Sequence, residues 1–293
     1  MTKNYLLAIA SYKDEWKQNF FNTVVSKRNK EYCKLHNLEY IEITSDVNPI
    51  RNQYFWFTSF KHEEIIKNTL KEGDGLISID ADAIIIDMEK SLLPPNGKNY
   101  AYSIDTANTH CMGWSSFIKS DWTTNMLSLV NSQERYDSLI DKTYFHEGKG
   151  TEDSFWREFA EQASWYSLTG IKRHSNESFW NLPNFGWHSA KDEWTVYSLD
   201  ELHKNVHIFP SEYNVTELHG ESFGVNYINK VKYKDVVIRH FAGGQKWRRE
   251  WNNTKSIYFR FQKVNPYKYI NIYKIKTFLQ KLKGYVQSKL NIN

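Results

Sequence analysis

An apolar segment with two carboxylates at its centre occupies residues 76–87 and reads Leu76-Ile77-Ser78-Ile79-Asp80-Ala81-Asp82-Ala83-Ile84-Ile85-Ile86-Asp87. The segment is short and rich in β-branched residues, which favours a buried β-strand over a helix. Because alternate residues of a strand point to the same face, Asp80 and Asp82 are expected to converge on one cation. Buried carboxylates are normally paired or bound to a metal. The alternative is that one Asp caps a turn while the other meets a surface lysine.

The chain before this segment alternates between strand and helix patterns. Residues 5–10 and 38–44 have the composition of strands, and residues 51–70 have the spacing of a helix. Between the two strands, apolar residues recur at helix spacing, namely Trp16, Phe20, Phe21, Val24, Val25 and Tyr32. This order predicts an α/β fold with a mixed, mainly parallel sheet flanked by helices. Ligands of such sheets bind beyond the carboxyl ends of the strands, which is where Ser11 and Tyr12 are placed.

The pattern after the segment is less regular. Residues 100–104 predict another strand, and residues 121–134 predict a helix capped by Ser120. Residues 164–211 are rich in tryptophan and histidine and have no clear periodicity, which is typical of a loop region that carries acceptor specificity.

A further helix is expected to begin at Thr151-Glu152-Asp153-Ser154 and to run to about residue 162. Carboxylates are favoured in the first turn of a helix, so Glu152 and Asp153 have a structural explanation. A role in substrate binding is the other interpretation.

A second group of polar residues follows an apolar run late in the chain, in Val236-Val237-Ile238-Arg239-His240-Phe241-Ala242-Gly243-Gly244-Gln245-Lys246-Trp247. Neutral His240 can ligate a metal, although a histidine in such a place is also often a buried hydrogen-bonding residue. Gly243 and Gly244 allow backbone N–H groups to approach an anion. Lys246 can supply positive charge to a phosphate.

The composition limits the compartment and the class of protein. Two cysteines in 293 residues, Cys33 and Cys111, give no disulfide framework and no zinc-finger spacing, which favours a reducing compartment. No signal peptide and no apolar run of about 20 residues occurs, so we expect a cytoplasmic protein, either soluble or held at the inner surface of a membrane. The 16% aromatic content suits a site for ring-shaped ligands such as sugars, or a core rich in aromatic residues.

The last 43 residues differ in charge from the rest of the chain. Residues 251–293 hold nine Lys or Arg and no acidic residue, whereas residues 1–250 carry 29 basic and 34 acidic side chains. Apolar residues recur there on one helical face, namely Ile275, Phe278, Leu279, Leu282, Val286 and Leu290. This predicts a basic amphipathic C-terminal helix on an anionic membrane surface, with packing on the core or contact with nucleic acid as alternatives. We expect a main domain at 1–250 and a tail at 251–293.

Taken together, the two motifs resemble those of metal-dependent glycosyltransferases of the GT-A fold. The pair Ile79-Asp80-Ala81-Asp82-Ala83 and His240-Phe241-Ala242-Gly243-Gly244-Gln245-Lys246-Trp247 is similar to the motifs of the retaining families 8 and 34, which include galactosyl-, glucosyl- and xylosyltransferases. The second motif lacks the proline that family 8 places between the lysine and the tryptophan. The order of motifs and elements matches over residues 4–250.

The resemblance implies a Rossmann-like sheet and a site for a nucleotide sugar, with UDP as the expected nucleotide. Asp80, Asp82 and His240 would hold Mn²⁺ or Mg²⁺ against the diphosphate, and an imidazole ligand favours Mn²⁺. Lys246, with the backbone of Gly243 and Gly244, would stabilise the departing phosphates. A cation and a lysine are what a diphosphate leaving group requires, since negative charge grows on it during transfer.

Other roles follow from the resemblance alone. Ala8, Ser11 and Tyr12 would border the nucleoside, and Arg51 would approach the diphosphate or the sugar. Ala81 would lie against the donor between the two carboxylates. The catalytic residues would be Asp82 and Lys246, together with Asp153 facing the transferred sugar and the acceptor.

The expected reaction is Mn²⁺-dependent transfer of a sugar to a glycan or glycolipid, with retention of configuration. Alternatives are a phage-type transferase that glycosylates modified nucleic acid, a metal-dependent nucleotidyltransferase, and a non-catalytic carbohydrate-binding protein on the same fold. The segment after the first strand does not resemble the Gly-rich, basic loop of nucleotidyltransferases. The chain also contains no Gly-x-x-x-x-Gly-Lys-Ser/Thr loop for ATP hydrolysis and no Gly-x-Ser-x-Gly elbow for a hydrolase.

Overall fold

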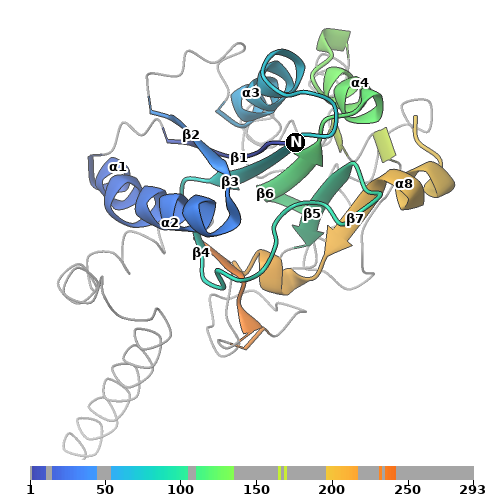
Figure 1. Ribbon diagram of the computed structural model, residues 1–293. Helices are drawn as coiled ribbons and strands as arrows, with labels where there is room; N and C mark the ends of the chain where they lie inside the picture. The colour runs from blue at the N-terminus through green and yellow to red at the C-terminus, as the bar shows by residue number, and fades with distance from the viewer. Residues whose placement is uncertain are drawn as a thin grey trace, which may run out of the picture. The chain divides into compact units, whose positions relative to one another are not determined.

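A computed structural model of the chain describes a central sheet with helices on both faces (Figure 1). The residues that it describes are 2–10, 15–44, 54–104, 110–134, 164–165, 168–169, 196–216, 231–232 and 235–241. The six strands of the main sheet lie in the order β2-β1-β3-β6-β5-β7. The predicted α/β fold with a mixed, mainly parallel sheet is confirmed.

All strands of the main sheet except β6 run in one direction. The pairs β1–β2, β1–β3 and β5–β7 are parallel, whereas β6 is antiparallel to both β3 and β5. The bounds are Asn4–Ile9 for β1, Glu39–Ile43 for β2, Gly75–Asp80 for β3, Tyr100–Ile104 for β5, His110–Ile118 for β6 and Val206–Phe209 for β7. Consecutive residues of β1 and β3 are buried on both faces of the sheet, which explains why their sequences are largely apolar rather than alternating.

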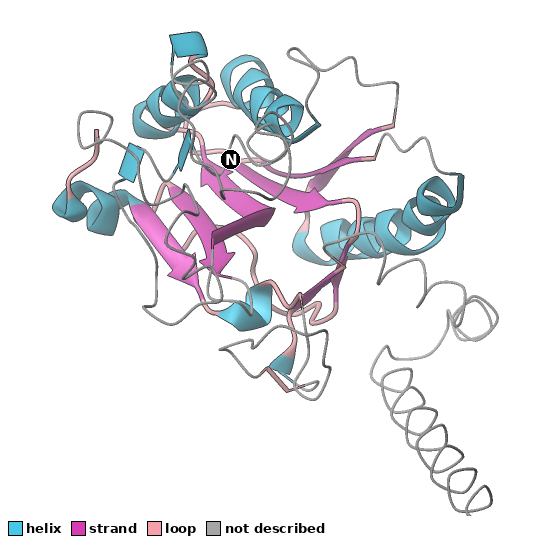
Figure 2. Cartoon of the chain, turned by 180° about the vertical axis from the view of Figure 1, so that it is seen from behind, coloured by secondary structure: helices cyan, strands magenta, loops and turns pink. Residues whose placement is uncertain are grey.

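Two groups of helices cover the sheet (Figures 1 and 2). One group is continuous along the chain and consists of α1 (Glu15–Phe20), the π-helical turn η1 (Phe21–Val25) and α2 (Ser26–His36). The other group consists of α3 (Tyr54–Asn68) and α4 (Asp121–Val130), which pack on the alternate side chains of the strands. The core on that face includes Tyr5, Leu7, Ile9, Ile65, Ile66, Leu76, Tyr100, Phe117, Met126 and Leu127.

The helix cap at Ser120 is present as predicted. The Ser120 hydroxyl accepts a hydrogen bond from the backbone N–H of Thr123 at 3.1 Å. The helix that it starts ends at Val130 rather than at residue 134.

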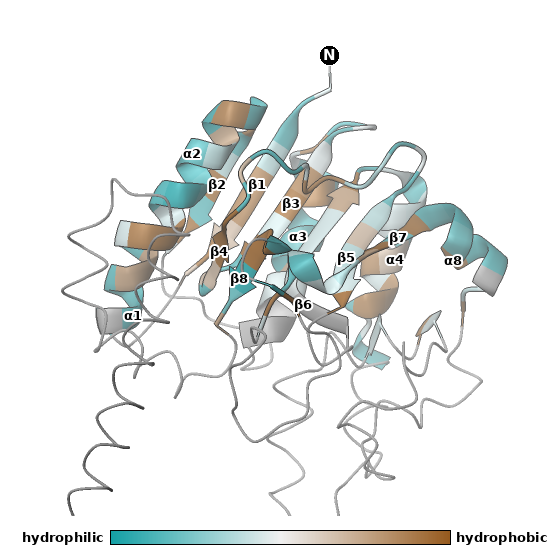
Figure 3. Cartoon of the chain, turned by 90° about the horizontal axis from the view of Figure 1, so that it is seen from below, coloured by the Kyte–Doolittle hydropathy of each residue, from teal (hydrophilic) through white to brown (hydrophobic). Residues whose placement is uncertain are grey.

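The expectation of an irregular region over residues 164–211 is wrong for its last part. Helix α8 spans Leu199–Asn205 and leads directly into β7, and the short 3₁₀ helix η4 spans Ser211–Tyr213. The helix is short and capped by Ser198, and the strand has four residues, so neither is long enough to show a clear period in the sequence. Figure 3 shows that α8 is largely hydrophilic, whereas the central strands are hydrophobic.

The segment 76–87 does not form the single strand that its composition predicts. β3 ends at Asp80, Ala81 and Asp82 form a turn, and β4 begins at Ala83 and ends at Ile85. β4 belongs to a separate two-stranded sheet, in which it pairs antiparallel with β8 (Ile238–His240). Both halves of the segment are buried, so the sequence is apolar on each side of the turn.

The described core belongs to one compact unit, made of Met1–Val231 and Val236–His240. The C-terminal helix predicted for residues 275–290 lies outside the described residues, and the boundary expected at residue 250 stays a prediction. In the part of the chain that the structure describes, no helix is long and apolar enough to cross a membrane.

Candidate functional site

Three potential metal ligands meet at the carboxyl end of β3. Asp80 is the last residue of β3, Asp82 lies in the turn that follows, and His240 is the last residue of β8. The antiparallel register pairs His240 with Ala83, so the histidine lies opposite the residue that follows Asp82. The main sheet and the two-stranded sheet thus meet at this point. Asp80 ends the apolar run of β3, and His240 ends the apolar run of β8.

The spacing of the three side chains suits a single cation. One ligand atom from each residue lies within 4.8 Å of the other two. His240 Nε2 is 3.4 Å from Asp82 Oδ1 and 3.6 Å from Asp80 Oδ2, both beyond the usual length of an N–H···O hydrogen bond. Adjacent ligands of an octahedral ion with bonds of about 2.1 Å lie about 3 Å apart. Small movements of the carboxylates therefore close the cluster around an ion.

The cluster is open on the carboxylate side. The side chains of Asp80 and Asp82 are 23% and 26% exposed, whereas that of His240 is 4% exposed. Three protein ligands leave about three positions of a six-coordinate ion for oxygens of another molecule. Two carboxylates with one imidazole suit Mn²⁺ or Mg²⁺, and the set contains no thiolate that would favour zinc.

Burial changes the protonation of Asp80. It raises the pKa of the Asp80 carboxyl to about 7, an effect that His240 opposes and the neighbouring Asp82 carboxylate strengthens. Without a cation, this group therefore keeps its proton up to near neutral pH. A divalent ion at the cluster favours the ionised form instead.

Two further residues contact His240, and the sequence motifs did not identify either. Asn214, fully buried, places its side-chain oxygen 2.9 Å from His240 Nδ1. Gly113 of β6 lies so close to the imidazole that a Cβ there would be 2.2 Å from Cε1. Gly113 could have been noticed, since a glycine inside a strand often marks a close approach of other groups. No local signal distinguishes Asn214 from an ordinary turn residue.

Arg28, near the start of α2, is hydrogen-bonded to the end of β4, the strand that follows Asp82. The Arg28 side chain donates from Nε to the carbonyl of Ile85 at 2.9 Å and from Nη2 to the carbonyl of Ile86 at 3.1 Å. Two such bonds use the fixed geometry of the guanidinium group, so they hold the end of β4 against α2. The turn that carries Asp82 is therefore anchored on both sides, by β3 and by β4.

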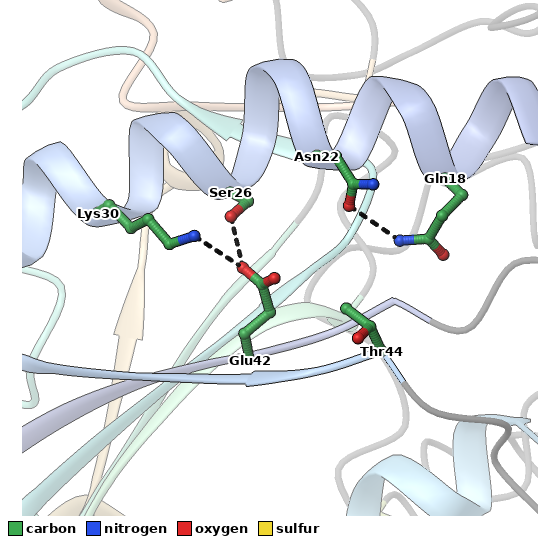
Figure 4. Close-up of a pocket in the computed structure, with 6 residues that line it drawn as sticks. All are labelled: Gln18, Asn22, Ser26, Lys30, Glu42 and Thr44. Carbon is green, nitrogen blue, oxygen red and sulfur yellow. Dashed lines mark hydrogen bonds and ion pairs between the residues drawn. The ribbon is translucent and has the colours of Figure 1, made fainter.

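A polar pocket of about 590 Å³ lies between the α1–α2 helix and the end of β2 (Figure 4). It is lined by Gln18, Asn22, Ser26, Lys30, Glu42 and Thr44. Glu42 accepts a hydrogen bond from the Ser26 hydroxyl and lies 3.5 Å from the Lys30 ammonium group. The amides of Gln18 and Asn22 are hydrogen-bonded to each other at 3.1 Å, next to Thr44.

The π-helical turn keeps the helical side of this pocket continuous. The four pocket residues that come from the helix are spaced four apart, namely Gln18, Asn22, Ser26 and Lys30. In a straight α-helix, four residues turn the chain about 40° further than one full turn, so residues at this spacing drift around the helix. The wider π-helical turn at Phe21–Val25 offsets this drift, so Gln18 and Lys30 line the same pocket. Single π-helical turns are frequent at functional sites.

The remaining predicted site residues have different outcomes. Ala8 is fully buried inside β1, between Glu42 of β2 and Ile79 of β3, and Ala81 is buried in the turn between the two carboxylates. Their roles beside the donor stay predictions. Ser11, Tyr12, Arg51, Asp153, Gly243, Gly244 and Lys246 lie outside the described residues.

Comparison with known proteins gave matches among solved structures only. No family model matches the chain, and no curated protein matches it in sequence. A glycosyltransferase involved in glycosylation of the major capsid of PBCV-1 is 11% identical, with a TM-score of 0.46 over 85% of this chain and 98% of its own.

Two further structures are similar at lower scores. The galactosyltransferase LgtC, solved with donor and acceptor sugar analogues, is 14% identical, with a TM-score of 0.30 over 82% of this chain and 87% of its own. The catalytic domain of Drosophila β1,4-galactosyltransferase 7 is 11% identical, with a TM-score of 0.30 over 52% of this chain and 58% of its own. The chain's own strand order, with the antiparallel β6 and an Asp-x-Asp and histidine cluster at the end of β3, is that of a GT-A, Rossmann-like fold.

Proposed function

We propose that this protein is a glycosyltransferase that moves a sugar from a nucleotide-diphosphate sugar to a glycan or glycolipid acceptor. The observation that carries the proposal is the cluster of Asp80, Asp82 and His240 at the carboxyl end of β3. Mn²⁺ is the proposed ion, UDP the proposed nucleotide and retention the proposed stereochemical course, the last two on the strength of the motif resemblance.

The residues of the cluster explain how a diphosphate can be received. Asp80 and Asp82 present carboxylate oxygens on the open side, while His240 closes the buried side. When bound, the divalent ion would neutralise the charge that grows on the diphosphate as the sugar leaves. Asp80 and His240 are held at the ends of strands and Asp82 in the short turn between β3 and β4, so little reorganisation is required when charge develops. Lys246 is proposed to add positive charge and Asp153 to face the sugar.

The polar pocket lies at a suitable distance to receive the nucleoside. Ile9 of β1 is in register with both Asp80 of β3 and Ile43 of β2. The strands on the two sides of β1 therefore reach the same level of the sheet. Neighbouring strands are about 4.8 Å apart, which puts the end of β2 about 10 Å from the end of β3. Thr44, which follows Ile43, lines the pocket. A nucleoside attached to a diphosphate at the cluster can extend over this distance.

A thermal-shift screen of UDP-, GDP- and CDP-sugars, each with and without Mn²⁺, tests the proposed function. A ligand that binds only the folded state at 100 times its Kd adds about 2.7 kcal/mol to the free energy of unfolding. For a chain of this size we expect Tm to rise by about 5 °C, with one nucleotide and only when Mn²⁺ is present. Incubation with acceptor should then release a nucleoside diphosphate. Release of pyrophosphate would indicate a nucleotidyltransferase, and glycan binding without metal-dependent donor binding would indicate a non-catalytic protein.

The pocket is tested by the variants Gln18→Ala and Thr44→Val. Each removes one uncharged hydrogen-bonding group, worth about 0.5–1.5 kcal/mol, so the KM for the donor should rise about two- to tenfold. We expect kcat to change little, because these contacts are the same in the ground state and the transition state. Lys34→Ala, on the exposed side of α2, serves as the matched control with unchanged KM. An altered KM for the acceptor instead of the donor would contradict the placement of the nucleoside.

A further inference from the structure

We propose that Asn214 is a positioning residue that directs Nε2 of His240 toward the metal, and that Gly113 provides the space in which the imidazole lies. The inference rests on the metal site proposed above. It concerns two residues outside both sequence motifs, on elements other than the strands that supply the ligands.

The first argument is the hydrogen bond to the imidazole. A neutral imidazole carries hydrogen on one ring nitrogen and a lone pair on the other. The side-chain oxygen of Asn214, 2.9 Å from Nδ1, can only accept a hydrogen bond, so Nδ1 carries the hydrogen. The lone pair is then on Nε2, which faces Asp80 and Asp82. The opposite orientation of the amide would place an N–H group against Nδ1 and leave Nε2 protonated, unable to ligate.

The second argument is that Asn214 cannot easily move relative to His240. The backbone N–H of Val215 donates to the carbonyl of Ile238 at 2.9 Å, and the N–H of His240 donates to the carbonyl of Val215 at 3.0 Å. Arg239 Nη1 also donates to the Val215 carbonyl at 3.0 Å. The residue after Asn214 is therefore hydrogen-bonded to the two residues that flank Arg239 along one edge of β8, which keeps the side-chain oxygen beside Nδ1.

The 3₁₀ helix before Asn214 is also held in place, by aromatic contacts and by a backbone hydrogen bond. The ring of Tyr213 lies 5.7 Å from that of Trp114 and 4.3 Å from that of Phe209. The N–H of Val237 donates to the carbonyl of Glu212 at 2.8 Å, a further bond between this segment and the chain leading into β8. The amide is thus held from both directions in the sequence.

The third argument is steric and concerns Gly113. A Cβ at this position would lie 2.2 Å from Cε1 and 2.4 Å from Nδ1 of His240, closer than van der Waals contact allows. β6 pairs with β3 as far as Trp114 and with β5 at Ser115 and Cys111, so the residues on both sides of Gly113 are held in the sheet and limit how far its backbone can withdraw. Among the described glycines, positive φ values occur at Gly73 and Gly97, so Gly113 is not required for its backbone conformation. Its requirement is space for the imidazole.

The test measures Mn²⁺ affinity by the electron paramagnetic resonance signal of free Mn²⁺, using the full chain. Loss of a hydrogen-bonding partner of a metal-bound histidine typically weakens binding 10- to 100-fold. We expect this loss for Asn214→Leu, and affinity within about threefold of the unaltered protein for Asn214→Asp, which keeps the acceptor. We expect Gly113→Ala to lose binding as completely as His240→Ala.

A second readout separates positioning from a structural role. In protein labelled with ¹⁵N-histidine and free of metal, the His240 signals should show hydrogen on Nδ1, and Asn214→Leu should change that pattern. The matched control is Asn131→Leu, which removes a buried Asn that bonds to the Ser59 carbonyl and to Glu63. This control should lower Tm and leave the Mn²⁺ affinity unchanged.

Each result decides one question. Unchanged Mn²⁺ binding in Asn214→Leu, or hydrogen on Nε2 in the unaltered protein, overturns the inference while the metal site stands. A failure of the unaltered protein to bind Mn²⁺ overturns the proposed metal site and the inference together. Weaker binding in Asn214→Leu that Asn214→Asp restores, with the control unaffected, supports the positioning role.

Discussion

Replacing Asp80 or Asp82 with alanine is expected to abolish sugar transfer and hydrolysis of the donor. Either change removes one of two negatively charged ligands and leaves His240 with a single carboxylate. A cation at a transferring phosphate supplies several kcal/mol of charge stabilisation in the transition state. Since each 1.36 kcal/mol is a factor of ten in rate, we expect a loss of about 10³-fold or more in kcat.

The experiment compares kcat, Mn²⁺ affinity and Tm in the two alanine variants and in a control. Asp87→Asn is the matched control, because Asp87 follows the same apolar segment but lies outside the cluster of Asp80, Asp82 and His240. We expect the control to keep its activity, and the alanine variants to keep the far-UV circular dichroism of the folded chain. Normal turnover in either alanine variant would contradict the proposed function.

The position of the ligands could be predicted from the sequence, but the reason for their convergence could not. Both apolar runs end in a metal-binding residue, and parallel strands place their carboxyl ends at one edge. However, Asp80 and Asp82 do not point to one face of a continuous strand, because the chain turns between them and enters a second sheet. An apolar pattern reports that a residue is buried and does not report its pairing partner.

The second sheet depends on a contact that no local pattern contains. Ala83–Ile85 pairs with Ile238–His240, and more than 150 residues separate the two strands in the chain. β6 was likewise not predicted, since glycine and two serines interrupt its apolar pattern and it runs against its neighbours. Asn214 acquires its role only through its distance to His240, so it follows from tertiary structure alone, and the glycine signal at Gly113 has meaning only once β6 is recognised as a strand.

The stability of the metal-free protein should increase when Asp80 is replaced with asparagine. Burial, together with the charge of Asp82 and against the influence of His240, raises the pKa of the Asp80 carboxyl to about 7. In the unfolded chain the group ionises near pH 3.9. Between these values the folded state binds more protons than the unfolded state, so the free energy of unfolding falls as pH rises. Asparagine cannot ionise and avoids this loss.

The expected result is a difference in the free energy of unfolding between Asp80→Asn and the unaltered protein. This difference should depend on pH and change sign when Mn²⁺ is added. In EDTA above pH 7, Asp80→Asn should exceed the unaltered protein by about 1–3 kcal/mol in free energy of unfolding, allowing for the partial exposure of the group. The difference should vanish below about pH 4, where aspartate is protonated in both states. Saturating Mn²⁺ at pH 8 should reverse the order, because the cation stabilises only the protein that keeps both carboxylates.

A variant less stable than the unaltered protein in EDTA at pH 8 would show that Asp80 is retained for the fold. The predicted reversal would show instead that the fold tolerates an unfavourable carboxylate because the ion requires it.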